Sequence, residues 1–286
     1  MSPEEARDVR AQAERGDAEA LATTAMFAAL GAFEPQDWRS AAVRLGLAAE
    51  AGSPAAAGQL RVLADGRDAP YADLAQAIDW TAWLASPPKS RISADPRVAV
   101  STSFLAPLAC QWVIERARGR VSRALVFEPA SGDFRTEPGR TNSAFSFAFE
   151  DMDVVTAAIR ARIAAALSVP AGALEPAQVL HYAPGEQFDR HFDFLDPAEP
   201  GFAAEIERGG QRIATLLVYL NHGFEGGETD FPRLSIRYKG AAGDALMFSN
   251  VDAAGAPDRR TLHAGLPPTT GEKWLLSQWI RDRALG

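Results

Sequence analysis

From Pro176 onward the chain carries short apolar runs separated by turn signals, with no helical segment between successive runs. The turn signals include Pro184-Gly185, Gly226-Gly227 and Ala242-Gly243-Asp244. Strands that alternate with helices build parallel sheets, whereas strands joined directly by turns build antiparallel sheets. The pattern therefore predicts a double-sheet jelly roll and argues against an alternating α/β fold. The predicted strands are Gln178–Tyr182, Ile213–Leu220, Ala245–Phe248 and Trp274–Trp279.

Two segments ahead of these strands, Pro107–Ala117 and Met152–Leu167, have apolar residues at helical spacing, and we expect both helices to brace the sheet. The alanine-rich N-terminal region is also expected to be helical. We therefore predict an α+β protein with a double-stranded β-helix (jelly-roll) core braced by helices and a small all-α N-terminal region. The predicted domains are residues 1–85 and 95–286, and the proline-containing segment Ala85–Val100 is the predicted joint.

A sequence echo links two parts of the N-terminal region, AERGDAEAL around Gly16 and AEAGSPAAAGQL around Gly52. The two glycines are 36 residues apart (52 − 16). Glycine at such a position ends one helix, and small alanines after it allow the next helix to pack closely. The region resembles tetratricopeptide-like repeats of the Sel-one type. The alternative is an alanine-rich helical bundle in which the matching glycines mark no repeat.

Charge and hydropathy exclude several classes of function. The net charge of −8, from 37 acidic and 29 basic residues, lacks the basic footprint that binding of nucleic acid requires, so nucleic acid is not expected as a partner. The N-terminus is charged and has no apolar run typical of a secretory signal, and no long apolar run marks a membrane span. We expect a cytoplasmic protein that does not associate with a membrane. The sequence favours no particular oligomeric state.

Histidine and aspartate side chains form the strongest chemical signal. The single cysteine, Cys110, excludes an intramolecular disulfide and a cysteine-based zinc site, so any metal is held by oxygen and nitrogen ligands. In His191-Phe192-Asp193, alternate residues of an extended chain point to the same face, so one ion can contact both. His263 is the best candidate for the third ligand. Two imidazoles and one carboxylate are the facial set of non-haem iron(II) oxygenases.

The surroundings of this tripeptide resemble the prolyl 4-hydroxylases. The run YAPGEQFDRHFD, from Tyr182 to Asp193, resembles the family pattern in which a tyrosine, a glycine and an aromatic residue precede H-x-D. Further motifs match in order over roughly Phe104–Gly286: RIATLLVYLN (Arg212–Asn221), GGET (Gly226–Thr229), GDALMF (Gly243–Phe248), and His263-Ala-Gly265 leading to Gly271-Glu-Lys273-Trp274. The resemblance implies iron(II) bound by His191, Asp193 and His263, with 2-oxoglutarate and O2 as cosubstrates and ascorbate as a reductant.

The resemblance also implies how 2-oxoglutarate is held. Lys273, ten positions after His263 (273 − 263), matches the family lysine that binds the distal carboxylate of the cosubstrate. A fixed ammonium group can offset the loss of hydration of a dicarboxylate through charge-assisted hydrogen bonds. Tyr182 matches the family tyrosine near the cosubstrate. Thr215 and Tyr219 lie at a spacing of four on a predicted strand, so both can face the interior, although a packing role fits as well.

Three residues match positions at which the family contacts substrate or shapes the pocket: Arg212, Trp279 and Arg140. For Arg212 the alternative is a structural ion pair with a nearby carboxylate, and for Arg140 it is a solvated loop arginine. Two long polar segments, 129–143 and 196–210, are expected to be loops that control access to the site.

The implied activity is hydroxylation of a C–H bond, with peptidyl proline at C4 as the leading target and release of succinate and carbon dioxide. The implied partner is a proline-containing peptide or protein. One alternative is hydroxylation of another protein side chain, a free amino acid or a metabolite, because these reactions share the iron and cosubstrate residues. A second alternative is a non-catalytic adaptor whose helices bind a peptide, and the intact ligand set argues against it.

Overall fold

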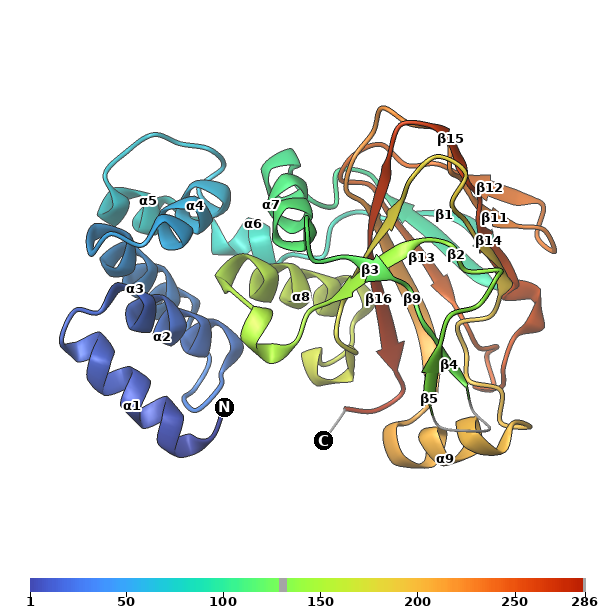
Figure 1. The fold of residues 1–286 in the computed structure, drawn as a ribbon, viewed down its shortest axis with the longest axis horizontal. Helices are drawn as coiled ribbons and strands as arrows, with labels where there is room; N and C mark the ends of the chain where they lie inside the picture. The colour runs from blue at the N-terminus through green and yellow to red at the C-terminus, as the bar shows by residue number, and fades with distance from the viewer. Residues whose placement is uncertain (129–132, 285–286) are drawn as a thin grey trace. The chain divides into compact units, whose positions relative to one another are not determined.

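The computed structural model describes residues 1–128 and 133–284, which divide into two compact units (Figure 1). The helical unit holds residues 1–86 and 147–167, and the sheet unit holds residues 87–146 and 168–286. The helical unit thus includes a second segment that the predicted domain boundaries placed with the sheet. In the part of the chain that is described, no helix is both long and apolar enough to cross a membrane.

The helical unit is built from short helices packed through small side chains. Ala25 and Phe27 of α2 and Ala41 and Leu45 of α3 are fully buried, and alanine in such positions allows helix axes to approach closely. The helices are α1 (Pro3–Glu14), α2 (Ala18–Leu30), α3 (Trp38–Glu50), α4 (Pro54–Leu63), α5 (Tyr71–Ala77), α6 (Trp80–Leu84) and α8 (Val154–Leu167).

Helix α8 contacts α2, α4 and α6, and Gln59 of α4 accepts a hydrogen bond from the Val154 N–H at its first turn (2.9 Å). Val154, Val155 and Ile159 are buried. The sequence predicted that this helix braces the sheet. Its apolar side showed that the helix is buried on one side, but not which element packs against that side. The structure places it in the helical unit.

The turns of α1–α2 and α3–α4 have the same construction. Gly16 (φ +84°) and Gly52 (φ +100°) both adopt the left-handed conformation that ends a helix. The next residue caps the following helix in each case, since the Asp17 side chain accepts from the Ala20 N–H and the Ser53 side chain from the Ala56 N–H. The Ser53 hydroxyl donates to Glu19 (2.9 Å), which links the second turn to the first helix pair. The two glycines thus end helices as predicted, and assignment to a Sel-one or tetratricopeptide class stays a prediction.

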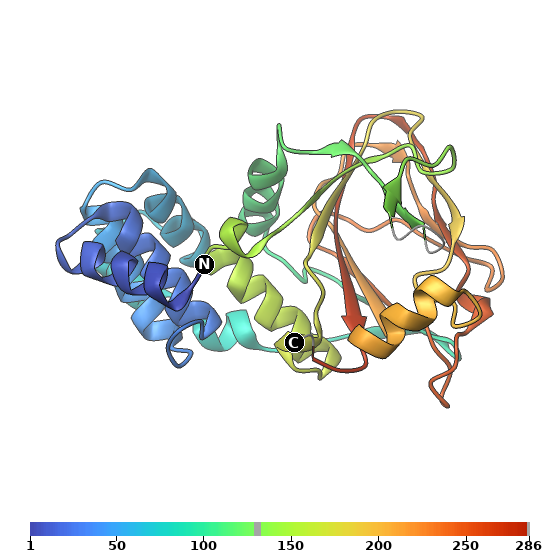
Figure 2. The ribbon, with the colours of Figure 1, turned by 60° about the horizontal axis from the view of Figure 1, so that its bottom comes forward.

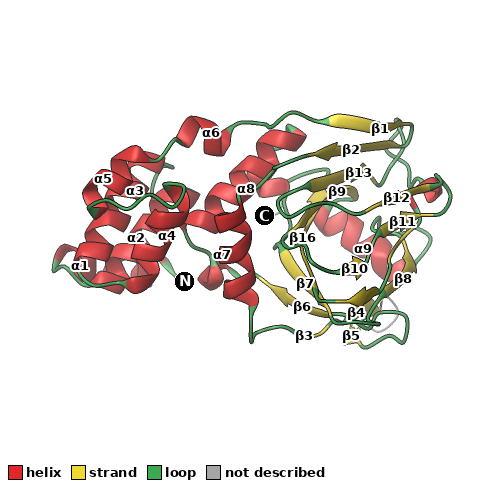
Figure 3. Cartoon of the chain, turned by 90° about the horizontal axis from the view of Figure 1, so that it is seen from above, coloured by secondary structure: helices red, strands yellow, loops and turns green. Residues whose placement is uncertain are grey.

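The sheet unit contains two antiparallel sheets that curve around a common interior (Figures 2 and 3). The eight-stranded sheet has the order β1 (Ser90–Ala94), β2 (Arg97–Ser101), β13 (Ala245–Ser249), β9 (Arg212–Tyr219), β16 (Lys273–Arg281), β7 (Gln178–Tyr182), β6 (Ser143–Ser146) and β3 (Ser122–Arg123). The four-stranded sheet has the order β12 (Ile236–Tyr238), β11 (Thr229–Phe231), β14 (His263–Gly265) and β8 (Phe188–His191). This arrangement fits the predicted jelly-roll core.

Smaller elements complete the sheet unit. Two-stranded pairs join β10 (Glu225–Gly226) to β15 (Pro268–Thr270) and β4 (Val126–Glu128) to β5 (Asp133–Arg135). Helix α7 (Pro107–Ala117) has the predicted bounds and contacts β7. The core of the unit includes Val98, Leu217, Phe231, Leu246 and Phe248.

Two sequence expectations need correction here. The predicted joint Ala85–Val100 contains the hairpin β1–β2, which extends the edge of the large sheet by pairing with β13. The predicted polar loop 196–210 contains helix α9 (Pro200–Gly209), in which Phe202 and Ile206 are spaced by one helical turn. Proline begins this helix and a glycine with positive φ follows it, so local start and stop signals were present.

The two glycine turns generate a stability prediction. Replacing Gly52 with alanine adds a Cβ that meets no atom within 4 Å, so the cost is conformational and we expect a loss of about 1–2 kcal/mol in the free energy of unfolding. Gly16→Ala should cost a similar amount. The control is Gly46→Ala in α3, where the new Cβ would lie 3.6 Å from that of Ala75, an ordinary contact, and helix propensity favours alanine. Urea unfolding checks this, and equal stability of Gly52→Ala and Gly46→Ala would contradict it.

Candidate active site

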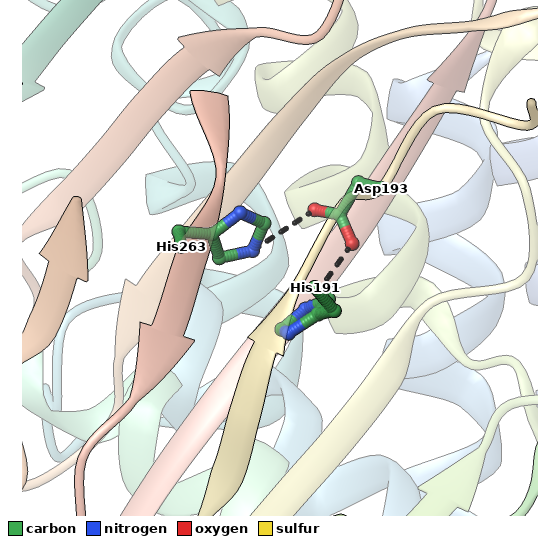
Figure 4. Close-up of side chains that lie close together, drawn as sticks. All are labelled: His191, Asp193 and His263. Atoms are coloured by element: carbon green, nitrogen blue, oxygen red, sulfur yellow. Dashed lines mark ion pairs between the residues drawn. The ribbon is translucent and has the colours of Figure 1, made fainter. Parts of the chain in front are cut away.

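Pairing of β8 with β14 brings the three predicted metal ligands together (Figure 4). His263, at the start of β14, lies directly opposite His191, at the end of β8, and Asp193 follows two residues after His191. The Asp193 carboxylate lies between the imidazoles, with Oδ1 3.6 Å from His191 Nε2 and Oδ2 3.5 Å from His263 Nε2. One ligand atom from each residue falls within 4.8 Å of the others. This donor set suits a divalent metal ion with open coordination positions.

Backbone carbonyl groups orient both imidazole rings. His191 Nδ1 lies 2.7 Å from the Asp189 carbonyl oxygen, and His263 Nδ1 lies 3.0 Å from the Thr261 carbonyl oxygen. Because a carbonyl oxygen only accepts, each Nδ1 carries the hydrogen, which turns Nε2 of each ring toward Asp193. Hydrogen bonds of this kind are the usual way in which proteins prepare histidines as metal ligands.

The protonation states of this cluster also suit a cation. Burial, together with the neighbouring His263, lowers the pKa of His191 to about 3, so its ring is neutral at neutral pH. Burial alone would raise the pKa of Asp193, but His263, His191 and the Thr215 hydroxyl outweigh it and hold the pKa below its usual value. The site therefore offers a neutral His191 imidazole beside a carboxylate, with the His263 ring next to both.

His191, Asp193 and His263 line a cavity between the two sheets. Side chains of the large sheet, among them Tyr182, Lys273 and Trp279, line it opposite His191 and His263. A ligand in this cavity can therefore contact the metal cluster at one end and residues of the large sheet along its length.

Lys273 is completely buried in the wall of this cavity, and its Nζ has no hydrogen-bond partner among residues 1–128 and 133–284. The ammonium group lies over the Tyr182 and Tyr219 rings, 4.7 and 5.7 Å from their centroids. Burial lowers the pKa of Lys273 to about 7, although Glu228 opposes the shift. An unpaired buried cation is costly, and a carboxylate of a bound dicarboxylate would satisfy it.

The other predicted cosubstrate residues occupy different positions relative to the cavity. Tyr182 lines it and pairs with Lys273 across β7 and β16. The Tyr219 hydroxyl is committed to Thr229 and to the Tyr238 carbonyl oxygen, each at 2.9 Å, so its ring rather than its hydroxyl faces Lys273. The Thr215 hydroxyl donates to Asp193 Oδ2 (2.7 Å), so Thr215 contacts a predicted metal ligand directly.

Arg140 is a buried wall residue of the cavity and not a solvated loop arginine. It is 6% exposed, donates to the Leu125 carbonyl oxygen (2.8 Å) and lies 4.5 Å over the Phe188 ring. Its Nε has no hydrogen-bond partner in the described part of the chain. Burial lowers the pKa of this guanidinium. Arg140 is therefore a buried cation of the cavity wall.

Arg212 forms the ion pair that the sequence left as an alternative. Its Nε and Nη2 donate to the two oxygens of Glu175 at 2.7 and 2.8 Å, and its guanidinium stacks on Trp279 at 3.7 Å. Arg281 Nε also donates to Glu175 (2.5 Å), and its Nη2 donates to Glu205 of α9 (3.0 Å). The network thus supports Trp279 from behind and ties α9 to the sheet. Sequence reasoning did not identify Glu175 or Arg281, since both are charged residues without a motif.

The two expected access segments flank this region. Residues 129–132 of the first segment lie outside the described residues, whereas Arg140 at its other end is placed in the cavity wall. The second segment contains α9, which Glu205 and Arg281 connect to the network around Glu175.

Comparisons with known proteins agree with this geometry. Residues 177–281 match the model of the 2OG-Fe(II) oxygenase superfamily. The chain is 32% identical over 216 residues to "Probable prolyl 4-hydroxylase 6" of Arabidopsis thaliana, with 69% of this chain and 73% of that protein covered. Prolyl 4-hydroxylase 1 of the same plant is 33% identical over 207 residues, with 68% and 71% covered.

A solved structure is similar as well. It is a viral collagen prolyl hydroxylase from Paramecium bursaria Chlorella virus-1 in complex with 2-oxoglutarate. The TM-score is 0.50 at 29% sequence identity, and the similarity covers 64% of this chain and 95% of that one. The similarity therefore extends over almost the whole of the viral chain.

The network around Glu175 generates a stability prediction. Glu175→Ala leaves Arg281, whose side chain is 5% exposed, and the mostly buried Arg212 without their common carboxylate. Removing one partner of a buried ion pair typically costs about 3–5 kcal/mol, so we expect a loss of this size in the free energy of unfolding. The control is Asp230→Ala, whose partner Arg237 is 61% exposed and whose ion pair should contribute less than about 1 kcal/mol. Equal losses in urea unfolding would count against the network.

Proposed function

We propose that this chain, which belongs to the prolyl 4-hydroxylase family of iron(II)- and 2-oxoglutarate-dependent oxygenases, hydroxylates peptidyl proline at C4 and releases succinate and carbon dioxide. One observation carries the proposal. The His191, Asp193 and His263 cluster and the unpaired ammonium group of Lys273 face the same cavity. A metal ion and a dicarboxylate fit the two features without any change in the residues present.

The roles of the residues follow from their positions. His191, Asp193 and His263 would hold iron(II), which together with 2-oxoglutarate and O2 supplies the oxidising chemistry. Lys273 would bind the distal carboxylate of 2-oxoglutarate, and the Tyr182 side chain would border it. The buried wall around them excludes water from this end of the cavity, which strengthens the charge interaction of Lys273.

Substrate would approach from the part of the cavity that Arg140 and Trp279 line. Arg140 offers an unpaired Nε–H to a peptide carbonyl group, and Trp279 offers an aromatic face to a proline ring. The Arg212 guanidinium would hold the Trp279 ring in place by stacking on it. The ion pair with Glu175 would balance the charge of Arg212. These contacts suit a proline-containing peptide or protein as the partner.

Other parts of the proposal rest on the sequence and the family. Ascorbate as the iron reductant, a cytoplasmic location and a lack of nucleic acid or membrane partners remain predictions. A different protein side chain, a free amino acid or a metabolite as the target is the second candidate, because the metal and cosubstrate residues would serve it equally. The adaptor alternative requires an idle site, and the complete ligand set speaks against it.

The direct test is succinate formation by the purified protein with iron(II), 2-oxoglutarate and ascorbate, with and without proline-rich peptides. We expect stimulation by a peptide that gains one oxygen by mass, and loss of turnover in His191→Ala because one metal ligand is gone. Stimulation by a free amino acid alone would favour the second candidate. If wild-type protein binds neither iron nor 2-oxoglutarate, the enzyme proposal fails.

The buried ammonium group of Lys273 generates a pH prediction. With its pKa near 7 the free lysine is largely neutral at pH 8, whereas binding of a carboxylate favours the charged form. We expect 2-oxoglutarate binding to take up close to one proton per site at pH 8 and close to none at pH 6. The affinity for 2-oxoglutarate should fall as the pH rises above about 7. Calorimetry in buffers of different ionisation enthalpy, with Mn(II) in place of iron, measures this.

The matched variants are Lys273→Arg, which stays charged and should show no proton uptake, and Lys273→Met, which should bind at least about tenfold more weakly. Equal proton uptake by wild type and Lys273→Arg would assign the proton to another group.

A further inference from the structure

We propose that Asn250 is a positioning residue for the metal centre, which acts through Thr215 on the carboxylate of Asp193. The inference rests on the proposed metal site. Asn250 is not among the residues that line the cavity beside His191, Asp193 and His263. Asn250 Nδ2 donates to Thr215 Oγ1 at 3.0 Å, and Thr215 Oγ1 donates to Asp193 Oδ2 at 2.7 Å. The Asn250 and Thr215 side chains are completely buried and Asp193 is 5% exposed, so solvent does not compete for these hydrogen bonds.

The direction of the relay follows from the hydrogen bonds themselves. The Thr215 hydroxyl has a single proton, and it points to Asp193 Oδ2. The remaining neighbour of the hydroxyl must then be a donor, which the amide group of Asn250 is. An aspartate at position 250 would instead compete with Asp193 for the same proton.

The amide keeps this orientation at a cost. Asn250 Oδ1 is buried and has no hydrogen-bond partner in residues 1–128 and 133–284. A buried acceptor of this kind costs about 1–3 kcal/mol. The Asn250 amide thus uses its donor to fix the Thr215 hydroxyl while its own acceptor stays unsatisfied.

The backbone holds Asn250 in place on both sides. It follows β13 directly, its N–H donates to the Ile213 carbonyl oxygen of β9 (2.8 Å), and its carbonyl oxygen accepts from the Asp258 N–H (3.0 Å). Thr215 is paired with Phe248 across β9 and β13, so the donor and the hydroxyl belong to neighbouring strands of the large sheet. The relay therefore connects the rigid large sheet to a ligand that follows β8 of the small sheet.

The consequence concerns how Asp193 presents its oxygens. Thr215 occupies a lone pair of Oδ2 and restricts rotation of the carboxylate, so Oδ1 is left as the better metal ligand. Ligation through one oxygen keeps a coordination position open, which a facial set of three ligands needs in order to bind cosubstrate. Asn250 thereby contributes to an open site without touching it.

The test uses metal binding and not turnover. Metal-free full-length protein is titrated with Co(II), and the visible absorption of the complex reports both affinity and coordination. We expect Asn250→Asp to bind Co(II) roughly tenfold to hundredfold more weakly than wild type, which is the usual loss when a residue that supports a metal ligand is replaced. The absorption spectrum of the complex should change as well. Thr215→Val should behave in the same way, whereas Thr215→Ser, which keeps the hydroxyl, should restore binding close to wild type. Asn250→Ala removes the donor without adding an acceptor and should weaken binding less than Asn250→Asp.

Coupling separates a relay from general damage to the fold. Because Asn250 acts only through the hydroxyl, the double variant Thr215→Val, Asn250→Asp should bind no more weakly than Thr215→Val alone. Thermal unfolding of the metal-free variants identifies any that do not fold, and Asn250→Ala then replaces Asn250→Asp in the cycle. Wild-type affinity of both Asn250 variants, or fully additive losses in the double variant, would overturn the inference. Failure of wild type to bind Co(II), or unchanged binding by His191→Ala, would instead refute the metal site itself.

Discussion

The pairing of β8 with β14 sets His263 opposite His191, and the chemistry of the cavity depends on that register. Because side chains alternate along a strand, a shift of one residue would turn an imidazole out of the interior. Neither strand is long enough to hold its register alone, since β14 spans only His263–Gly265. Pairing of β14 with β11 on its other side, and the carbonyl groups that orient each ring, hold the arrangement in place.

The large sheet supplies what the small sheet lacks. Thr215 on β9 orients the carboxylate of Asp193, and Lys273 at the start of β16 places a cation across the cavity from the imidazoles. Several buried polar atoms of this interior lack partners within the described residues, among them Lys273 Nζ and Arg140 Nε. Such atoms destabilise a folded chain unless a ligand satisfies them, and Lys273 and Arg140 both line the cavity of the metal cluster.

Prediction from sequence succeeded where the signal was local and long. Gln178–Tyr182 forms a strand with the predicted bounds. The predicted strands 245–248 and 274–279 lie within β13 and β16, and the predicted strand 213–220 is offset by one residue from β9. Strands of three or four residues, such as β8 and β14, carry too few side chains for an alternating pattern to be recognised. Helix 154–167 was recognised as a helix, but its packing against the N-terminal helices was not foreseen, because an apolar face does not say what covers it.

The sequence by itself determined the candidate metal ligands and the candidate cosubstrate lysine. The H-x-D spacing places His191 and Asp193 on one face, and the ordered motifs point to His263 and Lys273. Only the tertiary structure decided which hydroxyl holds Asp193, that Arg212 is neutralised by Glu175, and that Arg140 is buried in the cavity wall. The physical reason is sequence separation. Thr215, Asn250 and Asp193 meet through strands that are distant along the chain, and hydrogen bonds between such strands leave no local pattern to recognise.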